Sequence, residues 1–148
     1  MRERIFREHG DPDPWNLKHA RGGLIEAEFL AQYLQLRLLP DHPSMRTVST
    51  EQAFLQAAKV GALRAADARL LVDAVRHYRR LQAVLRLSVQ DRFAADTAPG
   101  GLRHALMRAA HGAGTDLPRD DLSALEEELR ETQAAVSRIF ARFCPADG

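Results

Sequence analysis

The feature that most constrains the fold is a long stretch in which apolar residues recur every three or four positions. Between residues 67 and 93 the apolar set is Leu71, Ala74, Val75, Tyr78, Leu81, Leu85 and Val89. An α-helix turns once every 3.6 residues, so this spacing places the whole set on one face of a helix. A helix with one apolar face needs partners to cover that face, so the chain is expected to form a packed assembly of helices.

Signals for helices continue along the chain, whereas signals for strands are nearly absent. Ala, Leu, Arg, Glu and Gln dominate, and all of them favour helices, while the β-branched run at 47–50 is too short for a sheet. Glycines and prolines divide the chain into six predicted helices at 2–9, 23–39, 50–59, 67–93, 102–111 and 119–143. The sequence therefore predicts an all-α fold, an antiparallel helical bundle of about five to six helices, in one domain over residues 1–148.

Local patterns also predict how some helices begin and where they lie. Ser49 or Thr50 can cap the helix over 50–59, and Asp67 can cap the next one. The helix over 23–39 is apolar on most of its circumference, which predicts a central position. The last helix carries one apolar face formed by Leu122, Leu125, Leu129, Val136, Ile139 and Phe143.

Composition limits the classes of partner. The 21 basic and 20 acidic residues give a net charge of +1, which gives no reason to expect nonspecific binding to nucleic acid or anionic membranes. No apolar stretch is long enough for a membrane span, and the first ten residues lack the core of a secretory signal. The single cysteine, Cys144, excludes an internal disulfide and fits a reducing compartment. We expect a soluble, cytoplasmic protein.

No metal or cofactor site is predicted from the residues themselves. The six histidines do not cluster at metal-ligand spacing, and no Cys/His arrangement is present. Trp15 and Tyr33 are expected to pack rather than to bind a cofactor.

A polar cluster lies just ahead of the helix over 23–39. Lys18 and Arg21 precede the pair Gly22 and Gly23. Two glycines let a backbone approach a ligand closely, and amides at a helix start favour anions, especially beside two cations. The same residues also fit a flexible helix start with solvated cations, because a bare Gly-Gly pair matches neither phosphate-binding fingerprint. Both interpretations remain open at this point.

Two glutamates follow within the helix. Successive helical residues turn by about 100°, so Glu26 and Glu28 point to nearly opposite sides and do not form a catalytic carboxylate pair. Glu28 lines up with two glutamines further along the helix, and such a polar stripe needs partners. Arg79 or Arg86 can supply an ion pair that fixes how two helices dock. A ligand-facing role for the same stripe is the alternative.

The surrounding segment, DPWNLKHARGGLIEAEFLAQYLQLR, resembles the Lys-x-x-x-Gly-Gly-x-x-Asp-x-Glu-Phe segment of glutamine synthetase adenylyltransferases, the bifunctional adenylyltransferase/adenylyl-removing enzymes. MRERIFREHG precedes this segment, and AFLQAAKVGAL and AVRHYRRLQAVLRL follow it, so the resemblance covers most of residues 1–95. Glu26 stands where the family usually has Asp. The flanking AQYLQLR is more like the second, adenylylating unit of these enzymes than the first.

The resemblance implies an activity and partners. Enzymes of this family attach AMP from ATP to a tyrosine of glutamine synthetase and remove it by phosphorolysis, in two units that each join an α/β catalytic domain to a helical domain. The Gly-x-Ser-Asp-x-Asp segment, whose aspartates hold Mg²⁺ in the family, does not occur in the 148 residues. The resemblance thus implies a C-terminal helical fragment that has no catalytic residues and binds neither ATP nor Mg²⁺ alone. The implied partners are glutamine synthetase, the PII signal protein and the enzyme's own nucleotidyltransferase domain.

The resemblance also implies roles for the polar cluster. The residues expected to face nucleotide phosphates across a domain cleft are Lys18, Arg21, Gly22 and Gly23, with Glu28 as the first and Glu26 as the second carboxylate. Two alternatives stay open, namely a binding module that docks glutamine synthetase or PII, and a scaffold that holds neighbouring domains apart.

Overall fold

The computed structural model describes residues 12–47, 49–88, 93–111 and 122–144. Within these ranges it contains five α-helices and no strand: α2 (Leu24–Leu38), α3 (Thr50–Lys59), α4 (Ala65–Ser88), α5 (Gly100–His111) and α6 (Leu122–Phe143). Short 3-10 turns at Pro43–Met45 and Ala95–Thr97 lie between them. The predicted all-α fold is confirmed.

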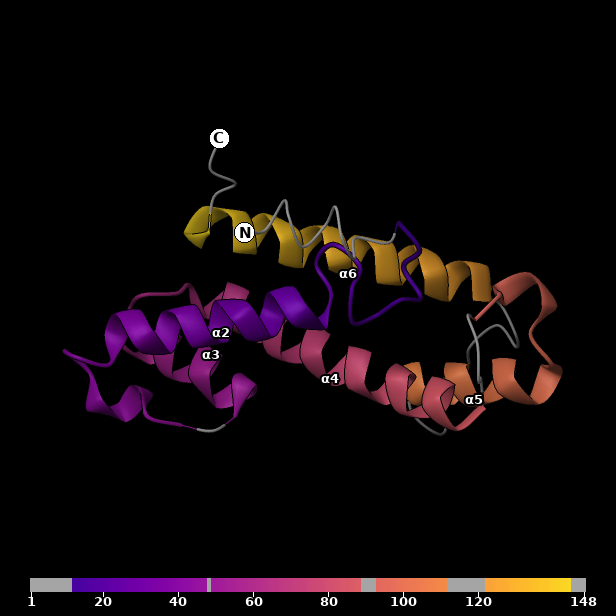
Figure 1. Ribbon diagram of the computed structural model, residues 1–148, viewed down its shortest axis with the longest axis horizontal. Helices are drawn as coiled ribbons and strands as arrows, with labels where there is room; N and C mark the ends of the chain where they lie inside the picture. The colour runs from indigo at the N-terminus through magenta and orange to yellow at the C-terminus, as the bar shows by residue number, and fades with distance from the viewer. Residues whose placement is uncertain (1–11, 48, 89–92, 112–121, 145–148) are drawn as a thin grey trace.

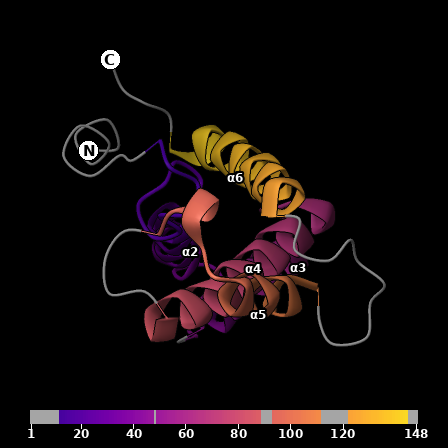
Figure 2. The same ribbon diagram turned by 90° about the vertical axis from the view of Figure 1, so that its right-hand side faces the viewer.

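The central helix is α4, because it packs against each of α2, α3, α5 and α6. In Figure 1, α2 and α3 lie toward one end of α4 and α5 toward the other, while α6 runs along the length of the bundle. The end-on view in Figure 2 shows α6 on one side of α4 and α5 on the other. The helix over 23–39, predicted to be central, packs against α3, α4 and α6, but the most central position belongs to α4, and two large apolar side chains of α2, Phe29 and Leu36, are exposed.

The helix ends agree with the sequence where local chemistry sets them. Ser49 caps α3 by accepting a hydrogen bond from the Gln52 amide at 3.3 Å. Beyond the end of α3, Gly61 takes φ +83°, a left-handed conformation that glycine adopts readily. The predicted helix over 2–9, residues 89–92 and residues 119–121 lie outside the described ranges.

Asp67 does not cap α4, which corrects the sequence prediction. The helix begins at Ala65, and the Ala68 amide already donates to the Arg64 carbonyl at 2.9 Å. Asp67 lies inside the first turn, and its Oδ2 is 2.7 Å from Nη1 of Arg142 near the end of α6. This ion pair joins the start of α4 to the end of α6, so the two helices run antiparallel.

The predicted apolar faces form the core. The α4 face is buried at Leu71, Ala74, Val75, Tyr78 and Leu81, and the α6 face at Leu122, Leu125, Leu129, Val136 and Ile139. Leu85 and Phe143 are half-buried at its margin. Trp15 is buried and Tyr33 packs against the core, as predicted. No helix among the described residues combines the length and apolar character that crossing a membrane requires.

Candidate functional site

The turn that leads into α2 is tied to α6 by two long-range hydrogen bonds. The indole Nε1 of Trp15 donates to Oε1 of Glu126 at 2.7 Å, and Nε2 of Gln133 donates to the Pro14 carbonyl at 2.8 Å. The Trp15 ring also meets the Phe93 ring edge-on, with centroids 4.9 Å apart. The turn over 13–23 is therefore held against the bundle, and a flexible helix start is not what the structure shows.

Gly22 contacts residues of three helices, and these contacts fix the position of the turn. Its amide donates to Oε1 of Glu26 at 2.7 Å, and its carbonyl accepts from the Tyr78 hydroxyl at 2.8 Å. Gly22 has φ +80°, and a Cβ at this position would lie 1.8 Å from the Gln133 carbonyl oxygen. Only glycine fits both the left-handed backbone and this close approach. We call Glu26, Tyr78 and Gln133 the glycine clamp.

The protonation state of Tyr78 keeps the clamp closed. Burial raises the pKa of its hydroxyl, and the nearby Glu26 carboxylate raises this pKa further. The hydroxyl therefore remains a proton donor to the Gly22 carbonyl at any pH near neutrality. Glu26 itself is 5% exposed and its Oε1 accepts from the Gly22 amide, while its role as a second cleft-facing carboxylate stays a prediction. Its side chain is used inside the domain.

The amides at the start of α2 are also used inside the protein. Besides the bond from Gly22 to Glu26, the donor–acceptor pairs are Gly23 to Ala20 at 2.8 Å, Leu24 to Leu17 at 2.8 Å and Ile25 to Lys18 at 3.1 Å, each to a backbone carbonyl. A Cβ on Gly23 would lie 2.4 Å from the Leu17 carbonyl oxygen. The two glycines thus allow close approach of the protein's own backbone, and the expected backbone cradle for a phosphate is filled by protein groups.

The two cations of the motif lie on the outside of this anchored turn. Lys18 and Arg21 are both exposed. The Lys18 side chain makes no ion pair or hydrogen bond with the described part of the chain, so its ammonium group is open to an external anion. What remains of the predicted nucleotide-facing set at the surface is therefore Lys18, Arg21 and Glu28.

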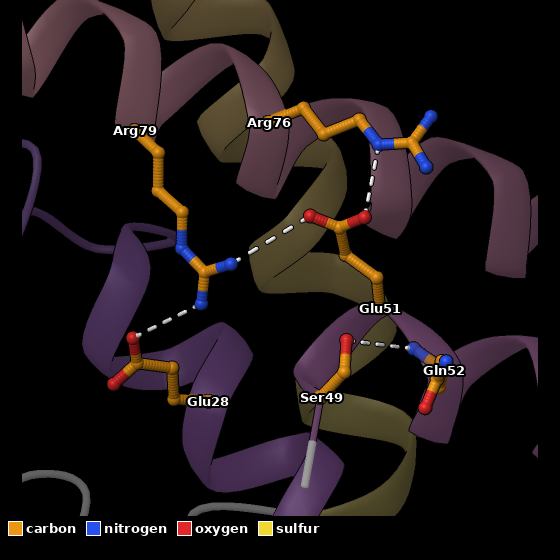
Figure 3. A network of polar contacts seen from close by, with 6 residues as sticks. All are labelled: Glu28, Ser49, Glu51, Gln52, Arg76 and Arg79. Atoms are coloured by element: carbon orange, nitrogen blue, oxygen red, sulfur yellow. Dashed lines mark hydrogen bonds and ion pairs between the residues drawn. The ribbon is translucent and has the colours of Figure 1, made fainter.

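Glu28 belongs to a surface network that joins α2, α3 and α4 (Figure 3). Its Oε1 lies 3.8 Å from Nη2 of Arg79, and Nη1 of Arg79 lies 3.6 Å from Oε1 of Glu51. Nε of Arg76 holds the other Glu51 oxygen at 2.9 Å. Of the two arginines proposed as partners of Glu28, Arg79 makes the contact, whereas Arg86 is exposed and takes no part. Sequence reasoning missed Glu51, since its place in the first turn of α3 reads as a solvated helix start.

A groove with a volume of about 570 Å³ lies between α4 and α6. Arg69 and Arg80 of α4 and Glu131 of α6 line it together with His77. His77 is 8% exposed, and its Nε2 has no hydrogen-bond partner among the residues that the structure describes. Burial lowers the pKa of His77. Of the smaller influences, Glu128 raises this pKa, whereas Arg80 and His111 lower it. The imidazole is therefore neutral near pH 7, and no sequence pattern predicted this groove.

The described residues contain no group of three or more His, Cys, Asp or Glu side chains that could hold a metal ion. The network around Glu28 brings only two carboxylates together, and both face arginines. The donor set at this site therefore does not fit a magnesium ion bound by this domain alone.

Comparison with known proteins gives a consistent family. The profile of the family described as GlnD PII-uridylyltransferase matches residues 2–144. A bifunctional glutamine synthetase adenylyltransferase/adenylyl-removing enzyme of Bradyrhizobium sp. (strain BTAi1) is 44% identical over 140 residues, which are 95% of this chain and 14% of the relative. Enzymes of the same name from Rhodopseudomonas palustris (strain BisB5) and Xanthobacter autotrophicus are 42% and 41% identical, over 99% and 96% of the chain.

The match covers nearly all of this chain but only a small part of each relative. The chain spans about one-seventh of the length of these curated relatives, 14% in each of the three cases. No solved structure gives a significant match. The chain belongs to the family described as GlnD PII-uridylyltransferase and is homologous to a segment of the bifunctional glutamine synthetase adenylyltransferase/adenylyl-removing enzymes.

Proposed function

We propose that this chain is the helical domain of a glutamine synthetase adenylyltransferase/adenylyl-removing enzyme. In this role it completes a nucleotide cleft whose other half is a nucleotidyltransferase domain. The activity is transfer of AMP from ATP to a tyrosine of glutamine synthetase and removal of that AMP by phosphorolysis. The observation that carries the proposal is the 42% identity over 99% of the chain to an enzyme of that name.

The structure favours a role for this chain in stabilising the negative charge of nucleotide phosphates. Phosphoryl groups in transfer reactions carry negative charge on several oxygens, and fixed cations stabilise that charge better than mobile ones. The glycine clamp fixes the backbone of the turn, and this turn presents Lys18 and Arg21 to solvent. Within the described part of the chain, the Glu28 carboxylate is held by the long contact to Arg79 alone, so it can turn toward a ligand group at little cost.

Magnesium and ATP enter as part of the proposal for the longer enzyme. Mg²⁺ would neutralise phosphate charge there, and its ligands would come from the nucleotidyltransferase domain, since the described residues of the helical domain hold no group of three or more metal-ligating side chains. The contribution of this chain is to hold Lys18 and Arg21 at the cleft and to keep the turn in register. The 148 residues alone are expected to transfer no AMP.

The test compares lysines in the full-length enzyme. Lys18→Ala should lower the rate of AMP transfer to glutamine synthetase by about 10-fold or more, because a lost charge-assisted contact is worth about 1.5–3 kcal/mol. Lys59→Ala, which removes an exposed lysine at the end of α3, is the matched control and should leave the rate unchanged. Thermal unfolding should be the same for both variants. Equal rates for Lys18→Ala and Lys59→Ala would contradict the proposal.

One observation favours a second candidate, a module that docks glutamine synthetase or the PII protein without serving the nucleotide site. Along α6 several acidic side chains are exposed, including Glu127 and Glu131, the latter at the groove between α4 and α6. Such a surface suits a basic patch on a partner. Calorimetry with the 148-residue chain distinguishes the two, since binding without nucleotide that is lost in Glu127→Lys favours docking.

A further inference from the structure

One face of α2 is apolar and lies outside the core. Ile25, Phe29, Gln32 and Leu36 follow one another at steps of four, three and four residues, which places them along a single ridge of the helix. We call these four residues the outer ridge of α2. The buried face of α2 is formed by other residues, Leu24, Ala27, Leu30, Ala31 and Leu34 among them.

The outer ridge is exposed to different degrees along its length. Leu36 is 76% exposed and Phe29 38%, while Ile25 is half-buried and is not part of the core. The Phe29 ring lies near the Phe140 ring of α6, with 6.0 Å between the centroids. A single exposed leucine needs no explanation, but three apolar side chains in line on one helix resemble the anchors of a helix that packs into a groove.

The ridge is continuous with the residues that the proposed function places at the cleft. The Ile25 amide, at the start of the ridge, donates to the Lys18 carbonyl at 3.1 Å. Glu28 lies four residues before Gln32 of the ridge, which makes the two neighbours on the surface of α2. Any surface that covers the ridge therefore also lies beside Lys18 and Glu28.

The length of the relatives indicates what covers the ridge. This chain matches 14% of a relative such as the Bradyrhizobium enzyme, so about six-sevenths of that polypeptide lies outside the match. A domain joined in the same polypeptide has a high effective concentration and can bind a small apolar patch that would be too weak for a separate protein.

We infer that the nucleotidyltransferase domain of the longer polypeptide packs against the outer ridge of α2. The partner offers an apolar groove to Ile25, Phe29 and Leu36, and its nucleotide lies toward the Lys18 end of the ridge. This inference rests on the proposed function for the identity of the partner. It adds the contact that sets the distance between the cations of this domain and the reacting phosphates.

Cysteine labelling measures whether the ridge is covered. Leu36→Cys is compared with Leu87→Cys, because Leu87 is 90% exposed on α4 and is isolated from the ridge. Both are made with Cys144→Ser, in the 148-residue chain and in the full-length Bradyrhizobium enzyme carrying this chain in place of its matching segment. Peptide mass spectrometry follows maleimide addition at each site.

Labelling at residue 36 should be at least about tenfold slower in the long polypeptide than in the 148-residue chain, because packing excludes the reagent. Labelling at residue 87 should be equal in the two. Equal rates at residue 36 would overturn the inference. A residue 36 already protected in the 148-residue chain, with protection rising with protein concentration, would show that a second copy covers the ridge and would also overturn it.

A second variant keeps the inference testable on the 148-residue chain alone. Leu36→Asp should leave its melting temperature unchanged, because the side chain has no core contacts to lose. A clear drop would show that the ridge belongs to the packing of this domain, which overturns the inference. Protection at residue 36 together with unchanged AMP transfer in Lys18→Ala would support the domain contact at the outer ridge and would reject only the proposed nucleotide cleft.

Discussion

Two polar networks hold α2 to the rest of the bundle, and they differ in almost every physical respect. The glycine clamp is buried, and its bonds to Gly22 measure 2.7 and 2.8 Å. The network in Figure 3 lies at the surface, with Arg79 3.8 Å from Glu28 and 3.6 Å from Glu51. Both connect α2 to α4.

The difference teaches which network sets the structure. A buried polar group that loses its partner retains the full penalty of leaving water, whereas an exposed ion pair that breaks regains hydration. The clamp therefore fixes the turn over 13–23, and the surface network leaves Glu28 able to move. The rigid part carries the backbone of the site, and the adjustable part carries its side chain. Changes at Gly22, at Tyr78 and in the Glu28–Arg79 pair test this contrast. A change at His77 tests the cost of a buried polar group outside both networks.

The largest effect is expected at Gly22, where the clamp closes on the backbone. Gly22→Ala should lower the free energy of unfolding by at least about 3 kcal/mol, because the new Cβ clashes with Gln133 and must also take a left-handed backbone. Gly61→Ala is the matched control, since Gly61 has φ +83° but nothing within 4 Å of its Cβ position. It should lose only about 1 kcal/mol in urea titrations. Similar losses would show that Gly22 is not closely packed.

Tyr78→Phe removes one bond of the clamp without changing its shape. The Gly22 carbonyl would be left buried without this donor, so we expect a loss of about 1–3 kcal/mol in unfolding free energy. Tyr33→Phe removes the only other tyrosine hydroxyl, which is reached by Arg37 at 3.3 Å on the surface, and should change stability by less than about 0.5 kcal/mol. A ranking in the opposite order would remove the clamp as the anchor of the turn.

His77 is a buried side chain whose Nε2 has no hydrogen-bond partner among the described residues, and this burial makes stability depend on pH. Burial lowers its pKa below the ordinary 6.5, so the unfolded chain takes up the proton first as the pH falls. The stability linked to His77 is present above about pH 6.5 and is lost progressively below it. His77→Gln should therefore reduce the slope of stability against pH in this range, measured by urea titrations from pH 7.5 to 5. An unchanged slope in His77→Gln would show that burial of this imidazole does not make stability depend on pH.

The smallest effect is expected in the surface network. A double-mutant cycle with Glu28→Gln and Arg79→Gln should give a coupling energy of about 0.5 kcal/mol or less, because both side chains are 46% exposed. This coupling should vanish in about 1 M salt, where the Debye length falls to about 3 Å. A coupling above about 1.5 kcal/mol that persists in salt would erase the distinction between the two networks.

Much of the fold follows from local patterns. The helix over 50–59 and its Ser49 cap were predictable, because capping and apolar spacing act over a few residues. The buried faces of α4 and α6 were predictable for the same reason. The start of α4 was not, because Asp67 has the chemistry of a cap yet is drawn into a pair with Arg142, 75 residues away.

The sequence drew attention to the polar residues around this turn, but it did not indicate where their side chains lie. Sequence alone singled out Lys18, Gly22, Glu26 and Glu28, and a resemblance gave them a shared purpose. It could not show that Gly22 meets Gln133, or that Glu26 turns inward while Lys18 stays outside. It also could not find the groove beside His77, whose walls come from separate helices.

The sequence by itself determined that this protein is a bundle of helices with a charged, glycine-containing turn ahead of α2. Periodicity and capping are local, so they can be read without knowing where the helices go. Only the tertiary structure decided that Gly22 packs against α4 and α6 and that the cations remain outside. Tyr78 and Gly22 are 56 residues apart and Gln133 and Pro14 are 119 apart, and such meetings are set by how whole helices pack, which no short segment encodes.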